Sequence, residues 1–178
     1  MKIKYLTVLL IMIGVMIPTM SQANENKEGS ESLRDLVFSL KPEQIGLTKE
    51  NFKHSIWGII METGLSDGYY TLVSLADGTT SLYFSNGGGI IGGGEHENVR
   101  EASRNFIAGA QHFYKKAVKD ATHSAPNNGE VKFYFLGFNE TFMYSAPENT
   151  LGDNKDDLSQ LFYVAHGVIT ELREMQEK

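Results

Sequence analysis

The chain has 178 residues, a net charge of −6 with neutral histidines, and no cysteine. The length suits one domain of ordinary size that can bury a core without cross-links. The acidic balance disfavours nonspecific binding to nucleic acid and to anionic lipid, because like charges repel. The lack of cysteine excludes disulfides, thiolate zinc sites, thiol nucleophiles and lipid attachment through an N-terminal cysteine.

The stretch 1–23 has the three parts of a secretory signal peptide. Lys2 and Lys4 precede an apolar run over 6–17, and a proline and small residues lead up to Ala23. The apolar run is shorter than the roughly 20 residues that a membrane-spanning helix needs. We therefore expect cleavage after Ala23, a periplasmic or secreted protein, and no stable membrane insertion after cleavage. An uncleaved N-terminal anchor is the alternative.

The chain after this stretch begins with a predicted leader and a short helix. Residues 24–30 are polar and charged, which predicts a flexible leader before a single α+β domain over 31–178. Apolar residues at helical spacing predict a helix over 33–40, which Pro42 ends. The connector 41–53 carries apolar residues that we expect to pack against the edge of the domain.

A strand-rich block follows the connector. The stretches 55–62, 69–75 and 79–85 each have the apolar and β-branched composition of a strand. Asp77-Gly78 is the strongest hairpin signal in the chain, because glycine adopts the positive φ of a tight turn. Three consecutive strands joined by tight turns predict an antiparallel meander.

The second half of the chain predicts two helices around another strand pair. A stripe of apolar residues from Val99 to Ala117 predicts a long helix. The aromatic stretch 131–138 and the stretch 141–144 predict paired strands, and 147–154 predicts a loop. The last helix has the clearest periodicity in the chain. Its expected buried residues are Leu158, Leu161, Phe162, Ala165, Val168, Ile169, Leu172 and Met175.

The predicted order of elements is therefore α-βββ-α-ββ-α. Two helices with apolar stripes need a surface to cover, and a five-stranded sheet offers one. We expect an α+β fold with a single antiparallel five-stranded sheet and helices packed on at least one face. Over residues 54–176 this succession resembles the profilin and roadblock/longin layered domains. The resemblance implies a scaffold for binding a ligand or a partner.

The segment 86–97 is the most unusual part of the sequence. Two glycine triplets flank a pair of isoleucines between a predicted strand and a predicted helix. Ordering glycine costs backbone entropy, so this composition indicates positive φ angles or close backbone approach. The candidate binding residues are Asn86, Gly87, Gly88, Gly89, Gly92, Gly93, Gly94, Glu95 and His96.

Three interpretations of this segment stay open. It can be a tight connection in which Ile90 and Ile91 fill the core, a surface that binds a partner or ligand, or a loop that binds an anion through backbone N–H groups. The segment lacks the Gly-Lys-Ser/Thr end of a phosphate-binding P-loop. Glu95 and Glu97 also bring negative charge to the start of the helix, where it complements the helix dipole and opposes an anion.

The sequence shows no catalytic or metal-binding pattern. His96 lacks the second histidine of a zincin helix, and no serine lies in a Gly-x-Ser-x-Gly motif. His166 adjoins the apolar stripe of the last helix, which is typical of a partly buried histidine with a satisfied ring. We therefore expect no metal, no cofactor and no nucleic-acid partner.

These observations favour an exported, non-enzymatic module that binds a protein partner in the cell envelope through the loop 86–97. Inhibitors and immunity proteins are one class of this kind. An enzyme with a dispersed site near Asn86, Glu95 and His96 is the first alternative. A small-molecule carrier with an apolar cleft between sheet and helix is the second.

Overall fold

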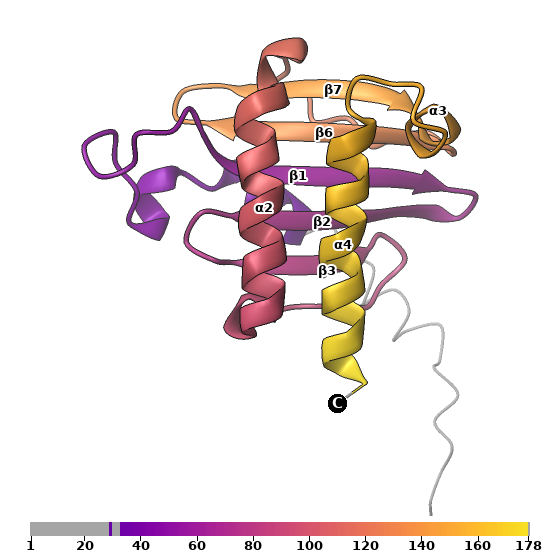
Figure 1. Ribbon diagram of the computed structural model, residues 1–178, viewed down its shortest axis with the longest axis horizontal. Helices are drawn as coiled ribbons and strands as arrows, with labels where there is room; N and C mark the ends of the chain where they lie inside the picture. Colours follow the sequence, from indigo (N-terminus) through magenta and orange to yellow (C-terminus); the bar gives the residue numbers. More distant parts are fainter. Residues whose placement is uncertain (1–28, 30–32, 178) are drawn as a thin grey trace, which may run out of the picture.

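A computed structural model describes residue 29 and residues 33–177 of the chain. Figure 1 shows one sheet crossed by two long helices that run across the strands. The sheet has seven strands in the order β4-β3-β2-β1-β6-β7-β5. Each neighbouring pair is antiparallel.

Strands and helices follow one another in blocks along the chain. The strands are β1 (Ile56–Leu65), β2 (Gly68–Leu75), β3 (Thr80–Phe84), β4 (Gly89–Ile90), β5 (Val118–Lys119), β6 (Glu130–Gly137) and β7 (Thr141–Pro147). The α-helices that follow β4 are α2 (Glu97–Phe113), α3 (Glu148–Gly152) and α4 (Ser159–Gln176). A short helix over 33–39 precedes them, and single turns of 3₁₀-helix lie at Pro42–Ile45, Gly93–Glu95 and Tyr114–Lys116.

The α+β class and the single antiparallel sheet are confirmed, but the prediction of five strands is wrong because the sheet has seven. The two additional strands, β4 and β5, have two residues each. So short a strand shows no alternation of polar and apolar side chains, and periodicity cannot reveal it. β5 also follows α2 closely: the helix ends at Phe113, whereas the apolar stripe continues to Ala117. The predicted loop 147–154 contains α3.

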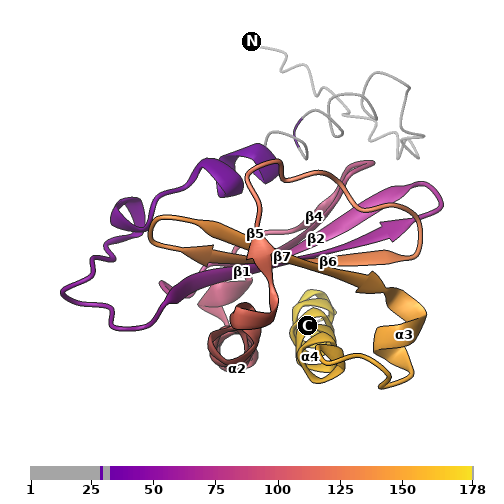
Figure 2. The same ribbon diagram turned by 90° about the horizontal axis from the view of Figure 1, so that it is seen from above.

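Helices α2 and α4 lie side by side on one face of the sheet (Figure 2). Their apolar stripes pack on the side chains of β1, β2, β3 and β6 that point the same way, such as Met61 and Phe133. Six of the eight residues expected to be buried in the last helix are buried, and Ile169 and Met175 are partly buried. This face holds the larger part of the core.

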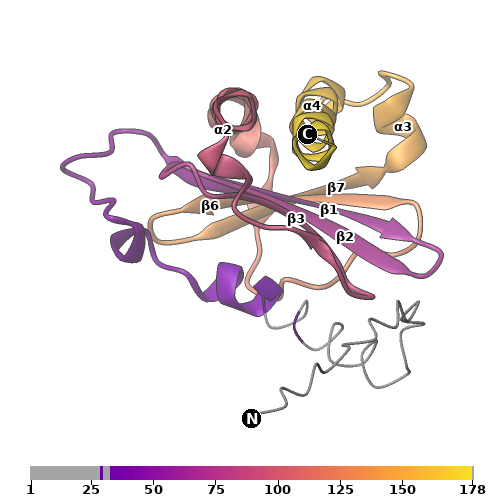
Figure 3. The ribbon, with the colours of Figure 1, turned by 90° about the horizontal axis from the view of Figure 1, so that it is seen from below.

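The chain from 33 to 52 covers the opposite face of the sheet (Figure 3). There Trp57, Ile60 and Tyr134 pack against apolar residues of this segment, including Phe38 and Phe52. The connector therefore covers a sheet face and extends well beyond the domain edge that the sequence predicted for it. Because both faces are covered, the central strands β1 and β6 are buried along most of their length.

A buried ion pair fixes the helix over 33–39 to this second face. Glu62 of β1 is fully buried, and Arg34 donates to both of its carboxylate oxygens, through Nε at 2.7 Å and Nη2 at 3.0 Å. The Thr71 hydroxyl donates to the same carboxylate at 2.9 Å. Arg34 Nη2 also donates to the carbonyl oxygen of His123 at 2.5 Å. The carboxylate therefore replaces its lost hydration with three hydrogen bonds and a cation.

No helix among the described residues is both long and apolar enough to cross a membrane. The predicted signal peptide over 1–23 lies outside the described residues, and so does the predicted leader over 24–30 except for residue 29.

Candidate functional site

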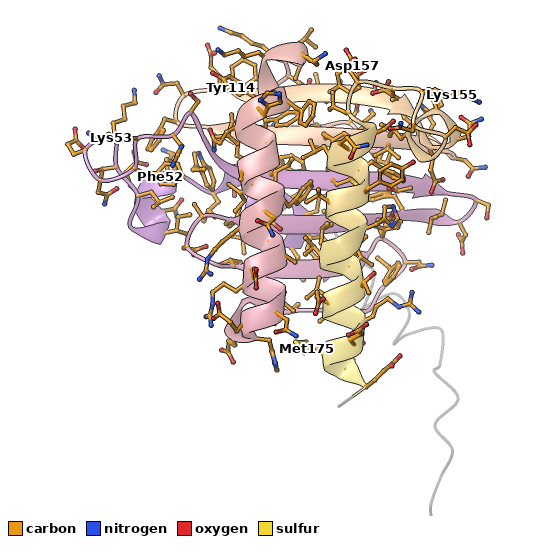
Figure 4. The ribbon with its side chains drawn as sticks, in the orientation of Figure 1. Phe52, Lys53, Tyr114, Lys155, Asp157 and Met175 are labelled. Carbon is orange, nitrogen blue, oxygen red and sulfur yellow. The ribbon has the colours of Figure 1, made fainter. Side chains whose placement is uncertain are left out.

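The glycine-rich segment 86–97 forms one edge of the sheet. It turns back after β3, pairs with β3 as β4, makes one turn of 3₁₀-helix at Gly93–Glu95 and enters α2. The C-terminal end of α4 reaches the same edge, and Figure 4 shows Met175 there, beyond β3. The fold thus joins this segment to a helix that lies 60 or more residues later in the chain.

Local packing accounts for the glycines of this segment. Gly89 has a φ of 154°, and a Cβ atom on it would lie 2.4 Å from the carbonyl oxygen of Leu82. A Cβ atom on Gly94 would lie 1.8 Å from the carbonyl oxygen of Gly78, in the tight turn before β3. Neither backbone oxygen can move away easily. The glycines therefore serve a tight connection, and they do not by themselves require a ligand.

The two isoleucines between the glycine triplets have opposite environments. Ile90 is buried in the core at 7 % exposure, whereas Ile91 is 67 % exposed. The expectation that both fill the core is therefore wrong for Ile91. Successive side chains of an extended segment point to opposite sides, so only one of two neighbours can enter a core that lies on one side.

The charged residues at the end of the segment do not form a common site. Glu95 and His96 are exposed, and within the described residues neither side chain makes a hydrogen bond or an ion pair. Glu97 instead binds Arg100 Nε at 3.0 Å and Arg104 at 3.2 Å, and the hydrogen bonds from Arg100 hold the pKa of Glu97 below its usual value. Glu97 thus stabilises the first turn of α2.

A groove of about 460 Å³ adjoins the segment, between the β3–β4 edge and the second half of α4. We call it the loop groove. Residues from four elements, β2, β3, β4 and α4, line it. Its apolar floor includes Tyr70, Leu82 and Ile90, and its helix wall includes Ile169, Arg173 and Gln176.

Arg173 and His166 of the loop groove have polar groups without a partner among the described residues. Arg173 is exposed and forms no ion pair within the part of the chain that the structure describes. His166 also lines the groove, and its Nε2 atom is buried without a hydrogen-bond partner among the described residues. Burial lowers the pKa of His166, so the ring is neutral at pH 7. The expectation of a satisfied histidine is therefore wrong at this nitrogen.

A second cavity, of about 450 Å³, lies beside α2 on the other side of the helix pair. Phe52, labelled in Figure 4, contributes to it together with Ile107. Its two arginines are already engaged, because Glu97 binds both and Arg100 also donates to the carbonyl oxygen of Gly94. The arginines of this cavity are therefore less available to a partner than Arg173 of the loop groove.

The structure separates most of the predicted site residues from the loop groove. Gly89 lines it, whereas Asn86, Glu95 and His96 do not. His96 lines a smaller cavity of about 200 Å³ between the start of α2 and the end of α4. Within the described chain, no three His, Asp or Glu side chains come close enough together to hold a metal ion.

Sequence reasoning missed the helix wall of the loop groove. Positions 166, 169, 173 and 176 follow one another at spacings of three and four, which places them on one side of α4. That pattern is visible in the sequence, but it does not reveal which element the stripe faces. In the folded chain β4 pairs with β3 beneath α4, and these four positions of α4 then form one wall of the groove.

Comparison with known proteins gave no match to a family model, to a curated protein or to a solved structure. The resemblance to profilin and roadblock/longin domains therefore stays a prediction.

Proposed function

We propose that this chain is an exported, non-enzymatic module that binds a protein partner through the surface around the loop groove. This surface, the loop–groove surface, consists of Phe84, Gly89, Ile91, Ile169 and Arg173. The observation that carries the proposal is a groove with an apolar floor at a sheet edge that also exposes two large apolar side chains, Phe84 in the groove lining and Ile91 one residue after Ile90 of the floor. An inhibitor or immunity protein is one class of protein that would use such a surface.

The composition of this surface supports the proposal. Ile91 and Phe84 are large apolar side chains exposed to water, at 67 % and 36 %. Fully burying a side chain of this size contributes roughly 1.5–3 kcal/mol. Arg173, which forms no ion pair with any described residue, adds a charge at the rim, and an apolar centre with a polar rim is typical of protein interfaces. A partner would therefore gain both apolar burial and a directional contact here.

The two alternatives have different support. The dispersed enzyme is less favoured, because Asn86, Glu95 and His96 do not line the loop groove. A small-molecule carrier is the second candidate function, because the groove volume of about 460 Å³ is within the range of ligand pockets, roughly 300–1,000 Å³. Native mass spectrometry of the purified chain tests the carrier, since a retained ligand would appear as an added mass.

Export is part of the proposal and has its own test. Protein recovered from the envelope fraction of the source cells should begin at Asn24 when its N-terminus is sequenced. An intact N-terminus on protein from the cytosol would contradict export.

A capture experiment with two matched variants tests the binding function. The full-length chain, expressed with its own signal, is cross-linked in the cells of origin and recovered with its neighbours. We compare it with Ile91→Asp and with Val118→Asp, because Val118 is equally exposed, at 65 %, on β5 at the other edge of the sheet. The proposal requires a partner that the wild type and Val118→Asp capture and Ile91→Asp loses. Equal capture by both variants, or none by the wild type, would contradict it.

A further inference from the structure

The two edges of the sheet differ in how they are protected. At the β5 edge, Lys119 forms an ion pair with Glu140, and Lys116 forms one with Asp157 nearby. Figure 4 shows Asp157 on this side of the molecule. Charged side chains on an edge strand discourage pairing with another strand. The β5 edge therefore has the usual protection against strand addition.

The β4 edge has no such protection. The stretch 86–94 contains no charged residue and no proline, and Ile91 extends from it into solvent. β4 is the outermost strand on this side of the sheet, so no other strand of the described chain pairs with its free edge. An uncharged edge with an exposed apolar side chain is a surface on which an extended chain can pair.

The hydrogen-bond pattern leaves backbone groups available at this edge. The N–H of Phe84 donates to the carbonyl oxygen of Gly88 at 3.1 Å. Bonded and non-bonded pairs alternate in an antiparallel ladder, so Leu82 and Ile90, two residues further on, form the next bonded pair. The N–H and C=O groups of Gly89 and the N–H of Ile91 then point away from β3, to the open side.

We propose that the β4 edge binds an extended segment of the partner protein as an additional strand. An apolar side chain of that segment enters the loop groove, and an acidic side chain faces Arg173. The proposal rests on the protein-binding function above and specifies its mode. Main-chain hydrogen bonds then provide affinity, and the groove provides selectivity.

The available length and charge favour a peptide segment over a second copy of this chain. The open backbone groups span only Gly89 to Ile91, which is enough for a short strand. A stable dimer needs roughly 1,000 Å² or more of buried surface. Two copies would also bring together chains that each carry a net charge of −6. Arg173 lies in an acidic protein and is unpaired in the described chain, so it complements an acidic segment.

A phage-displayed library of random linear peptides is the probe. The full-length chain selects peptides, and the enriched ones are titrated by fluorescence anisotropy against the wild type, Ile91→Ala, Ile91→Pro and Arg173→Gln. Ile91→Pro removes the outward N–H, whereas Ile91→Ala removes only the side chain. Ile90 is extended, which is the conformation that a residue before proline prefers, so the fold should accept this change.

Enriched peptides should combine an apolar and an acidic residue. They should bind Ile91→Pro about five-fold more weakly than Ile91→Ala, as expected for one lost hydrogen bond, and Arg173→Gln about five-fold more weakly than the wild type. In the wild type, peptide binding should slow amide hydrogen exchange at Gly89 and Ile91. This measurement decides the question even if Ile91→Pro does not fold.

Specific results would overturn the proposed mode. Equal binding by Ile91→Pro and Ile91→Ala, or unchanged exchange at the two amides, would exclude strand addition. Equal binding by Arg173→Gln and the wild type would exclude the acidic contact, and failure to enrich any linear peptide would exclude the extended segment. None of these results affects the capture experiment with Ile91→Asp, which tests protein binding itself.

Discussion

Replacing Arg34 by Met should strongly destabilise this protein, because it leaves the carboxylate of Glu62 buried without a cation. Glu62 is fully buried, and Arg34 supplies two of its three side-chain hydrogen bonds. Met retains most of the apolar stem of arginine, so the change removes the charge and the donors more than the packing. The variant therefore isolates the electrostatic part of the contact.

The magnitude follows from the burial of the pair. Removing one partner of a buried ion pair costs roughly 3–5 kcal/mol. The side chain of Arg34 is 12 % exposed, so some water can reach the vacated space, and we expect the lower end, about 3 kcal/mol. The lost hydrogen bond to the carbonyl oxygen of His123 is included in this value.

Urea unfolding at neutral pH, followed by circular dichroism, measures the effect. The same experiment on Glu62→Gln and on the double variant completes a cycle. Gln is neutral and can still accept from Thr71, so we expect Arg34→Met to cost about 2 kcal/mol less in the Glu62→Gln background. Arg104→Met is the control, because its ion pair with Glu97 is exposed and should leave the midpoint nearly unchanged.

Two outcomes would refute this reasoning. A cost below about 1 kcal/mol for Arg34→Met would mean that water or another group compensates the carboxylate. Strictly additive effects of the two substitutions would mean that the side chains do not depend on each other, despite the distances of 2.7 and 3.0 Å.

Further predictions concern pH and the close glycine contacts. Burial lowers the pKa of His123 and His166 below 6.5. Under mildly acidic conditions the unfolded chain therefore binds more protons at these two histidines than the folded chain does. The free energy of unfolding should therefore be unaffected by these groups above that pH and should fall on acidification below it; replacing both histidines by Gln should flatten the profile. Gly94→Ala should cost about 2 kcal/mol or more, because its Cβ would lie 1.8 Å from the carbonyl oxygen of Gly78. Gly167→Ala, in the exposed middle of α4 with nothing within 4 Å, should instead raise stability by up to about 1 kcal/mol in the same urea assay.

The long elements of this fold could be predicted from the sequence. In the last helix, the spacing of Leu161, Ala165, Val168 and Leu172 predicts the buried side, and all four residues are buried. The five longer strands also follow from composition and from turns such as the one at Asp77-Gly78. Local periodicity was sufficient there, because each element buries its own apolar side and repeats that pattern over several residues.

The candidate site was only partly predictable. The sequence singled out 86–97 through its glycines, and the structure shows that packing against Gly78 and Leu82 accounts for Gly94 and Gly89. Nothing in the segment itself indicates that Ile90 is buried and Ile91 exposed. The groove also needs Arg173 and Ile169 from α4, which no local pattern connects to β4.

The sequence by itself determined the class of fold, the long helices and strands, and the lack of cysteine chemistry. These properties depend on composition and on repeats within a few neighbouring residues. Only the tertiary structure decided the two short edge strands, the burial of Glu62 against Arg34, and the meeting of the glycine-rich segment with the end of α4. Those features join residues that are distant in the chain. Their free energy comes from packing and from desolvated contacts between elements, which a one-dimensional pattern does not contain.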